Sequence, residues 1–153
     1  MVNPSLEKYL LEEIVPRYSG FDLAHREDHA MTVISQAMLL LDGMPSDGTP
    51  VDRDMLMAAA ACHDLGLVNG RDNHHLDSGK IIREDERLKE WFDTEQIETI
   101  ARSCRCQRFA DVTFGIHAVH IRAYTHAGRK VELILMAHQA LAAAQLGIGV
   151  QFS

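Results

Sequence analysis

The chain lacks the features that membrane-spanning and secreted proteins require. Its 153 residues contain no apolar run of about 18 residues, the length needed by a membrane-spanning helix. The N-terminus has no basic segment followed by an apolar run, so we predict no signal peptide. Three cysteines, an odd number, fit a reducing cytoplasm better than a disulfide framework. We therefore expect a cytoplasmic protein without a membrane partner.

An excess of basic residues is also missing. The chain holds 15 Lys and Arg against 22 Asp and Glu, a net charge of −7. Because phosphate backbones are bound by clustered Lys and Arg, we expect no nucleic-acid partner. There is no internal repeat and no low-complexity segment. With 46% hydrophobic and 24% charged residues, residues 1–153 predict a single globular domain with its own core.

Apolar residues recur at helical spacing through most of the chain. The pattern predicts a helix over 4–18, a second over 23–42 with Asp22 as its N-cap, and a third that reaches His63. Asp52 or Asp54 would cap the third helix, His74 and His75 open a fourth, and Asp93 or Thr94 caps a fifth. The strongly apolar residues 130–146 predict a further helix, which could pack on the bundle or form a homodimer with a second copy.

The stretch from Ala58 to Leu67 is central to the chemistry. A run of small apolar residues ends in the doublet His63-Asp64, and Gly66 follows. Adjacent residues do not share a helix face, so a doublet that acts as one unit suits the end of a helix. A neutral imidazole beside a carboxylate can bind a divalent metal. The alternative is a surface aspartate beside a partly buried histidine.

Two other stretches flank the doublet in sequence. Upstream, His25, His29 and Val33 form the pattern H-x-x-x-H-x-x-x-V. Downstream, residues 70–79 form the pattern G-R-x-x-H-H-x-x-x-G. Together with the small-small-x-H-D-x-G of the doublet, these motifs resemble the HD superfamily of metal-dependent phosphohydrolases over roughly residues 20–90.

The resemblance implies a fold and an activity. The expected fold is all-α, an HD-domain-like bundle of five to six helices around a metal cleft. The expected activity is hydrolysis of a nucleotide or another small phosphoester by a metal-activated water. The nitrogen and oxygen donors suit Mn, Fe, Co, Ni, Zn or Mg without choosing among them.

The resemblance also implies the metal ligands. His29, followed by Val33 at the family's interval, would be the first ligand, and His63 and Asp64 the next two. In the two-metal branch of the superfamily, a histidine four residues before a glycine binds the second metal, and His75 fits that interval better than its neighbour His74 does.

Three residues are expected to act on the substrate. Asp64 would also orient the attacking water. His25 would lie beside the ligands or contact a substrate phosphate. Arg71 would meet the phosphate, since a planar guanidinium suits bidentate contact. A simple surface charge is the alternative for Arg71.

The last third of the chain departs from the family pattern. Residues 1–100 hold 20 acidic and 9 basic side chains, whereas residues 101–153 hold 2 and 6. The family's last metal-binding aspartate is absent, and His138 stands at the nearest equivalent position. One hypothesis is that His138 replaces this aspartate as a ligand. The other is a slip of the reading frame near residue 102.

Two further functions stay open at this point. The missing aspartate allows a catalytically impaired HD scaffold that binds a metal or a nucleotide without turnover. A redox di-iron oxygenase is the third possibility, since the HD scaffold resembles those enzymes too. It needs more ligands than the sequence allows us to place.

Overall fold

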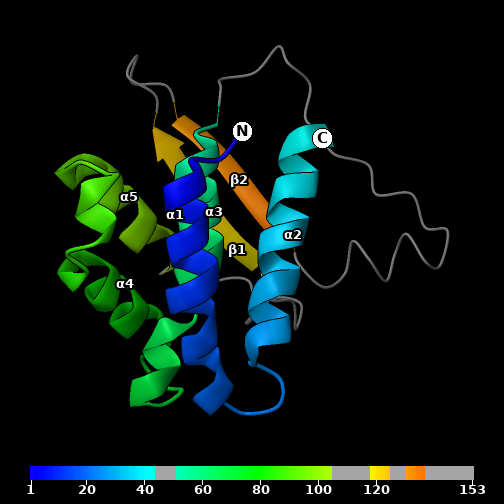
Figure 1. Cartoon of the computed structure of the whole chain (residues 1–153), viewed down its shortest axis with the longest axis vertical. Helices are drawn as coiled ribbons and strands as arrows, with labels where there is room; N and C mark the ends of the chain where they lie inside the picture. The colour runs from blue at the N-terminus through cyan, green and yellow to red at the C-terminus, as the bar shows by residue number, and fades with distance from the viewer. Residues whose placement is uncertain (44–50, 105–117, 125–129, 137–153) are drawn as a thin grey trace, which may run out of the picture.

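The computed structural model describes residues 1–43, 51–104, 118–124 and 130–136. The described chain is mainly a bundle of α-helices, which confirms the predicted fold (Figure 1). The five α-helices are α1 (Pro4–Tyr9), α2 (Glu27–Gly43), α3 (Arg53–Cys62), α4 (His74–Glu84) and α5 (Thr94–Ser103). The shorter helical segments are η1 (Leu10–Ile14), η2 (Val15–Gly20), η3 (Leu65–Asn69) and η4 (Leu88–Glu90). The two strands are β1 (Ala118–Tyr124) and β2 (Lys130–Met136).

Helix α3 lies in the middle of the bundle, between α2 on one side and α4 and α5 on the other (Figure 1). Every residue from Met55 to Cys62 is buried, and Ala58 to Ala61 are fully so. Their small side chains let neighbouring helices approach closely. The Asp52 carboxylate accepts hydrogen bonds from the amides of Asp54 and Met55, as predicted for the cap.

The predicted first helix is a helical column of three different windings, α1, η1 and η2. The amide of Val15 donates to the carbonyl of Leu10, five residues earlier, which is a π-helical bond. Pro16 follows and has no N–H to continue this pattern. The column therefore tightens into the 3₁₀ segment η2, which carries Tyr18 and ends at Gly20.

Helix α2 begins at Glu27, four residues later than predicted. Asp22 is not its N-cap, so that prediction is wrong. The Asp22 carboxylate accepts from the amide of Ala24 and from the ring of His25, and the His25 amide donates to the Asp22 carbonyl. These local bonds form a turn that competes with helix formation. As a result His25 precedes the helix, whereas His29 lies in its first turn.

Two features set the packing of α4 and α5. A Cβ on Gly66 would lie 2.0 Å from the carbonyl oxygen of His74, so only glycine lets η3 pack against α4. Helix α5 begins with a capping box in which Asp93 and Gln96 exchange side-chain and backbone hydrogen bonds. Helix α4 begins at His74 and helix α5 at Thr94, which confirms both predicted starts.

The antiparallel pair of strands β1 and β2 was not predicted. Its register pairs Ala118 with Met136 and Tyr124 with Lys130, and β1 runs beside α5. The helix predicted over 130–146 is therefore wrong for 130–136, and its remainder lies outside the described residues. Apolar content does not distinguish strand from helix in a short run, and the pairing depends on a segment distant in sequence.

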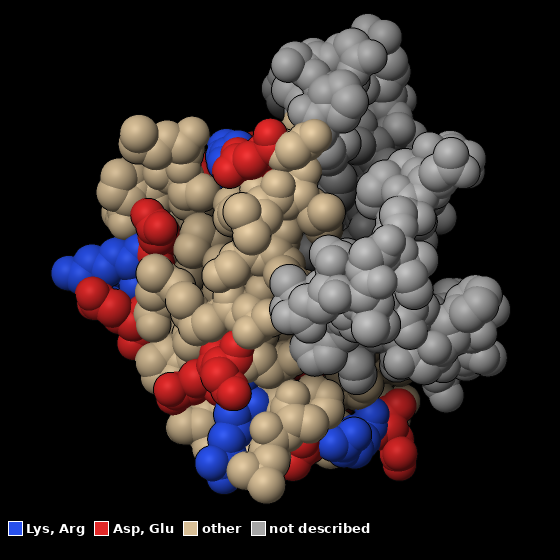
Figure 2. Space-filling view, turned by 90° about the vertical axis from the view of Figure 1, so that its right-hand side faces the viewer, with Lys and Arg blue, Asp and Glu red and all other residues tan. Residues whose placement is uncertain are grey.

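The described surface carries both charge signs. Lys and Arg are interspersed with Asp and Glu over the described part of the face in Figure 2. Within the described ranges, the structure contains no helix with the length and apolar character needed to cross a membrane.

Candidate metal centre

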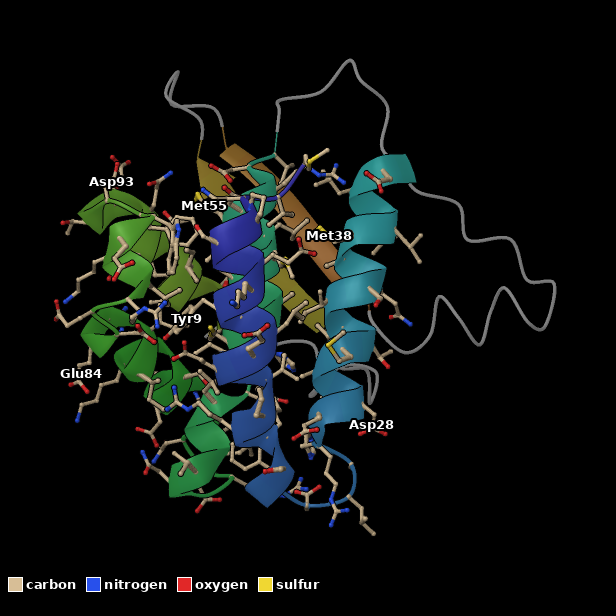
Figure 3. All side chains as sticks on the ribbon, viewed as in Figure 1. Tyr9, Asp28, Met38, Met55, Glu84 and Asp93 are labelled. Carbon is tan, nitrogen blue, oxygen red and sulfur yellow. The ribbon has the colours of Figure 1, made fainter. Side chains whose placement is uncertain are left out.

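Three of the predicted ligands meet at one point in the interior. His29 comes from the first turn of α2, His63 is the C-cap of α3, and Asp64 follows it. Asp28, labelled in Figure 3, marks the end of α2 where His29 lies. One ligand atom from each of the three residues lies within 4.8 Å of the others. Their exposed fractions are 8%, 2% and 2%.

The distances among these atoms fit a single ion. His29 Nε2 lies 3.2 Å from His63 Nε2, and Asp64 Oδ2 lies 3.0 Å from His63 Nε2 and 3.6 Å from His29 Nε2. Donor atoms about 2.1 Å from a common ion lie about 3.0 Å apart at a right angle and about 3.4 Å apart at the tetrahedral angle. The three atoms therefore form a triangle of the size that a divalent metal requires.

A backbone hydrogen bond fixes the tautomer of His63. Its Nδ1 lies 2.8 Å from the carbonyl oxygen of Ala60, so the proton is on Nδ1 and is donated there. In the neutral ring Nε2 then carries the lone pair that a metal would bind, and only the protonated ring can donate from Nε2 to Asp64. Metal-binding histidines usually donate their other ring N–H in this way, which orients the ring and raises its basicity.

The electrostatics of the doublet favour an ionised carboxylate. Burial alone would raise the pKa of Asp64, but His63 and His29 outweigh it and hold that pKa well below its usual range. Burial would lower the pKa of His63, yet the charge and hydrogen bond of Asp64 raise it above the ordinary value. Asp64 is thus available as an anionic oxygen donor.

Tyr18 contacts the backbone of the doublet, a role that the sequence did not reveal. Its hydroxyl donates to the carbonyl of Ala61 at 2.8 Å and accepts from the amide of Asp64 at 3.2 Å. Burial raises the pKa of Tyr18 well above its usual value, so the hydroxyl stays protonated. Tyr18 lies 46 residues before Asp64, at the end of the helix predicted over 4–18.

His25 and Arg71 lie together beside the cluster, joined by Asp22. One Asp22 oxygen accepts from His25 Nδ1 at 2.9 Å, and the other accepts from Arg71 Nη2 at 2.5 Å. The His25 ring lies edge-on to that of His29, with 5.4 Å between centroids. The sequence analysis predicts only a capping role for Asp22, although its spacing of three residues from His25 could have indicated the pair.

The fourth helix brings His74 toward the doublet. His74 Nε2 lies 3.7 Å from Asp64 Oδ1, while its Nδ1 donates to the carbonyl of Arg71 at 2.6 Å. His75 is also buried, but it is not part of the His-His-Asp cluster found among the described residues. Its role as a ligand stays a prediction. His138 lies outside the described residues.

Comparison with known proteins gives one match. The family model described as HD domain matches residues 26–138, so it extends beyond the 20–90 region of the predicted resemblance and ends at His138. No curated protein and no solved structure matches the chain. The matched segment spans most of the chain and contains the His29, His63 and Asp64 cluster. The chain belongs to the HD domain family.

Proposed function

We propose that this HD-domain protein is a metal-dependent phosphohydrolase that acts on a nucleotide or another small phosphoester. HD domains bind divalent metals, and most are metal-dependent hydrolases. The observation that supports the proposal most is the convergence of two imidazole nitrogens and one carboxylate oxygen in a buried position. Buried polar groups of this kind require compensation, which a cation would supply.

His29, His63 and Asp64 would hold the ion. A divalent ion supplies Lewis acidity: it lowers the pKa of water from 15.7 toward about 7 and polarises a phosphoryl oxygen. Three protein donors leave coordination positions for water and substrate, as in catalytic sites. The donor set suits Mn, Fe, Co, Ni, Zn or Mg.

Asp64 has a second task in this proposal. Its Oδ2 faces the two imidazoles, whereas its Oδ1 is directed toward His74. The depressed pKa of Asp64 keeps Oδ1 an acceptor, so it would take a hydrogen bond from the attacking water and orient it. The low exposure of Asp64 limits competition from bulk water.

Arg71 and His25 would neutralise the phosphate. The Arg71 side chain is 65% exposed, so an incoming phosphate can reach its guanidinium. The phosphate would replace Asp22 as the acceptor for Arg71 Nη2. The planar guanidinium of arginine can form two charge-assisted hydrogen bonds to a phosphate.

A second candidate is a metal- or nucleotide-binding module without turnover. The sequence observation in its favour is the absence of the family's last aspartate, at whose nearest equivalent stands His138. The loss of one ligand would lower the affinity of the site for the ion without necessarily abolishing binding.

Metal content and turnover together test both candidates. We would measure bound metal in the wild type, in Asp64→Ala and in Asp72→Ala, a control that removes an exposed carboxylate from the loop before α4. The proposal expects one or two equivalents of metal in the wild type and the control, and none in Asp64→Ala. Metal-dependent hydrolysis of a nucleotide or phosphomonoester should follow the same pattern. Metal without turnover of any such substrate would favour the binding module. A wild type that binds no added metal would overturn the phosphohydrolase and leave only a nucleotide-binding module without metal.

A further inference from the structure

The His63-Asp64 doublet can bind a metal only if the chain leaves the helix between the two residues. Neighbouring residues in a helix point about 100° apart, so their side chains diverge. Here the atoms His63 Nε2 and Asp64 Oδ2 converge to 3.0 Å. Asp64 has φ −113° and ψ 11°, in the bridge region outside the helical range.

The end of helix α3 leaves carbonyl groups that need other partners. The last four carbonyls of a helix have no intrahelical donor, and those of Ala60 and Ala61 belong to this set. The His63 ring donates to the Ala60 carbonyl, and the Tyr18 hydroxyl donates to the Ala61 carbonyl. The same hydroxyl accepts the Asp64 amide.

Tyr18 is well placed to hold this conformation. It is fully buried, at 0% exposure, and its ring lies 6.1 Å from the ring of His63. Its hydroxyl is both donor and acceptor, so it ties Ala61, two residues before the doublet, to Asp64, the second residue of the doublet. Segment η2, which carries Tyr18, is far from the doublet in sequence.

We propose that Tyr18 is a positioning residue that sets the backbone of Asp64, and thereby the affinity and geometry of the metal centre. This inference rests on the proposed function, because it assumes that the centre binds a metal. Removing the hydroxyl would free the Ala61 carbonyl and the Asp64 amide, and the carboxylate would lose its fixed place beside His63.

The test compares Tyr18→Phe with Tyr9→Phe. Each variant removes one phenol hydroxyl from a buried tyrosine, and that of Tyr9 donates to the side chain of Asp85 at 2.6 Å. In the metal-free protein, we expect faster hydrogen exchange of the Asp64 amide in Tyr18→Phe only. With Co²⁺ alone as the probe, we expect about tenfold weaker binding and an altered visible spectrum in Tyr18→Phe only.

The outcomes separate this inference from the proposed function. Faster exchange together with weaker Co²⁺ binding, specific to Tyr18→Phe, supports the positioning role. Equal Co²⁺ affinity and an unchanged spectrum in Tyr18→Phe and wild type would overturn it while leaving the metal centre in place. Absence of Co²⁺ binding in the wild type would overturn both proposals. Equal losses in both variants would mean a general loss of stability and would also overturn the positioning role.

Discussion

The Nε2 atoms of His29 and His63 lie 3.2 Å apart in the protein interior, although the residues are 34 positions apart in the chain. His63 donates its Nδ1 proton to Ala60, so a neutral His63 presents a lone pair to His29. His29 can meet that lone pair only with a proton of its own, or with an ion shared between the two rings. A metal ion would satisfy both nitrogens and the Asp64 carboxylate at once.

Metal addition should therefore stabilise the fold. At a free metal concentration of 100 times Kd, the free energy of unfolding should rise by about 2.7 kcal/mol. For a domain of this size that corresponds to a rise in Tm of about 5–10 °C, measurable by calorimetry and reversible with a chelator. The same metal should leave the Tm of His29→Ala unchanged. If no divalent metal tested changes the Tm of the wild type, the assignment of His29, His63 and Asp64 as a metal centre is contradicted.

Gly66 should not tolerate a side chain. A Cβ there would lie 2.0 Å from the His74 carbonyl oxygen and 2.5 Å from the Ser78 nitrogen, both backbone atoms that cannot rotate away. Gly66→Ala should therefore lower the free energy of unfolding by about 1–3 kcal/mol or more.

Gly20→Ala is the matched control for Gly66→Ala. Apart from its chain neighbours, no atom of the described residues lies within 4 Å of a Cβ built at Gly20. The unfolding free energy of Gly20→Ala should therefore stay within about 0.5 kcal/mol of wild type. Urea denaturation of both variants measures the difference. Equal stabilities would mean that η3 and α4 can move apart at little cost.

Local signals in the sequence predicted most of the helical bundle. Asp52 and the Asp93–Gln96 capping box mark the starts of α3 and α5 because side-chain oxygens there accept backbone amides. Two features differ from the prediction. The predicted start of α2 was wrong because Asp22 forms local bonds to Ala24 and His25. The helix predicted over 130–136 was wrong because these residues form a strand that pairs with β1.

The metal cluster could be predicted because its residues form spaced motifs, and its surroundings could not. His29, His63 and Asp64 were named from sequence and lie together. Tyr18 was missed because a tyrosine in an apolar helix looks like core, and only the tertiary fold brings its hydroxyl to the doublet. The contact of His74 with Asp64 likewise depends on how α4 packs against the doublet, which motif spacing does not determine.

The buried cysteines should be unreactive in the native protein. Cys62 and Cys104 are both 0% exposed, and burial raises the pKa of the Cys62 thiol well above its usual value and that of Cys104 to about 12. At pH 8 only about one in 10⁴ Cys104 side chains would be thiolate. In a Cys106→Ser variant, which removes the cysteine outside the described residues, Ellman's reagent should label neither thiol until denaturant is added. Rapid labelling of the folded variant would contradict their burial.

The ion pairs of Glu98 should make stability depend on acidic pH. Arg83 contacts both Glu98 oxygens, at 2.7 and 3.1 Å, and Arg102 adds a bond at 2.7 Å. The hydrogen bond from Arg83 is the main cause that lowers the pKa of Glu98 from 4.5 to about 2. A depressed carboxyl pKa contributes stability above the unfolded value, and this contribution is lost as pH falls from 4.5 toward 2.

Glu98→Gln isolates that contribution. The Glu98 side chain is 36% exposed, so solvent screening limits the effect at neutral pH to about 0.5–1 kcal/mol. The difference in unfolding free energy between wild type and variant should shrink as the pH falls from 4.5 toward 2 and vanish below pH 2 in urea titrations. An Arg83→Gln and Glu98→Gln double-mutant cycle assigns the effect to the pair. A difference that stays constant with pH would mean that packing, not charge, is responsible.

Asp22 should compete with phosphate for Arg71. Its carboxylate holds Arg71 Nη2 at 2.5 Å and His25 Nδ1 at 2.9 Å, which are the two groups proposed to meet a substrate phosphate. Asp22→Asn keeps the shape but offers Arg71 a neutral, weaker acceptor and removes a negative charge beside the incoming anion. Inorganic phosphate should then bind about two- to five-fold more tightly, measured by calorimetry at fixed ionic strength. Arg71→Gln in the same assay should weaken phosphate binding, and the double variant should resemble Arg71→Gln alone. If Asp22→Asn instead weakens phosphate binding, the carboxylate orients Arg71 and His25 for the ligand and does not compete with it.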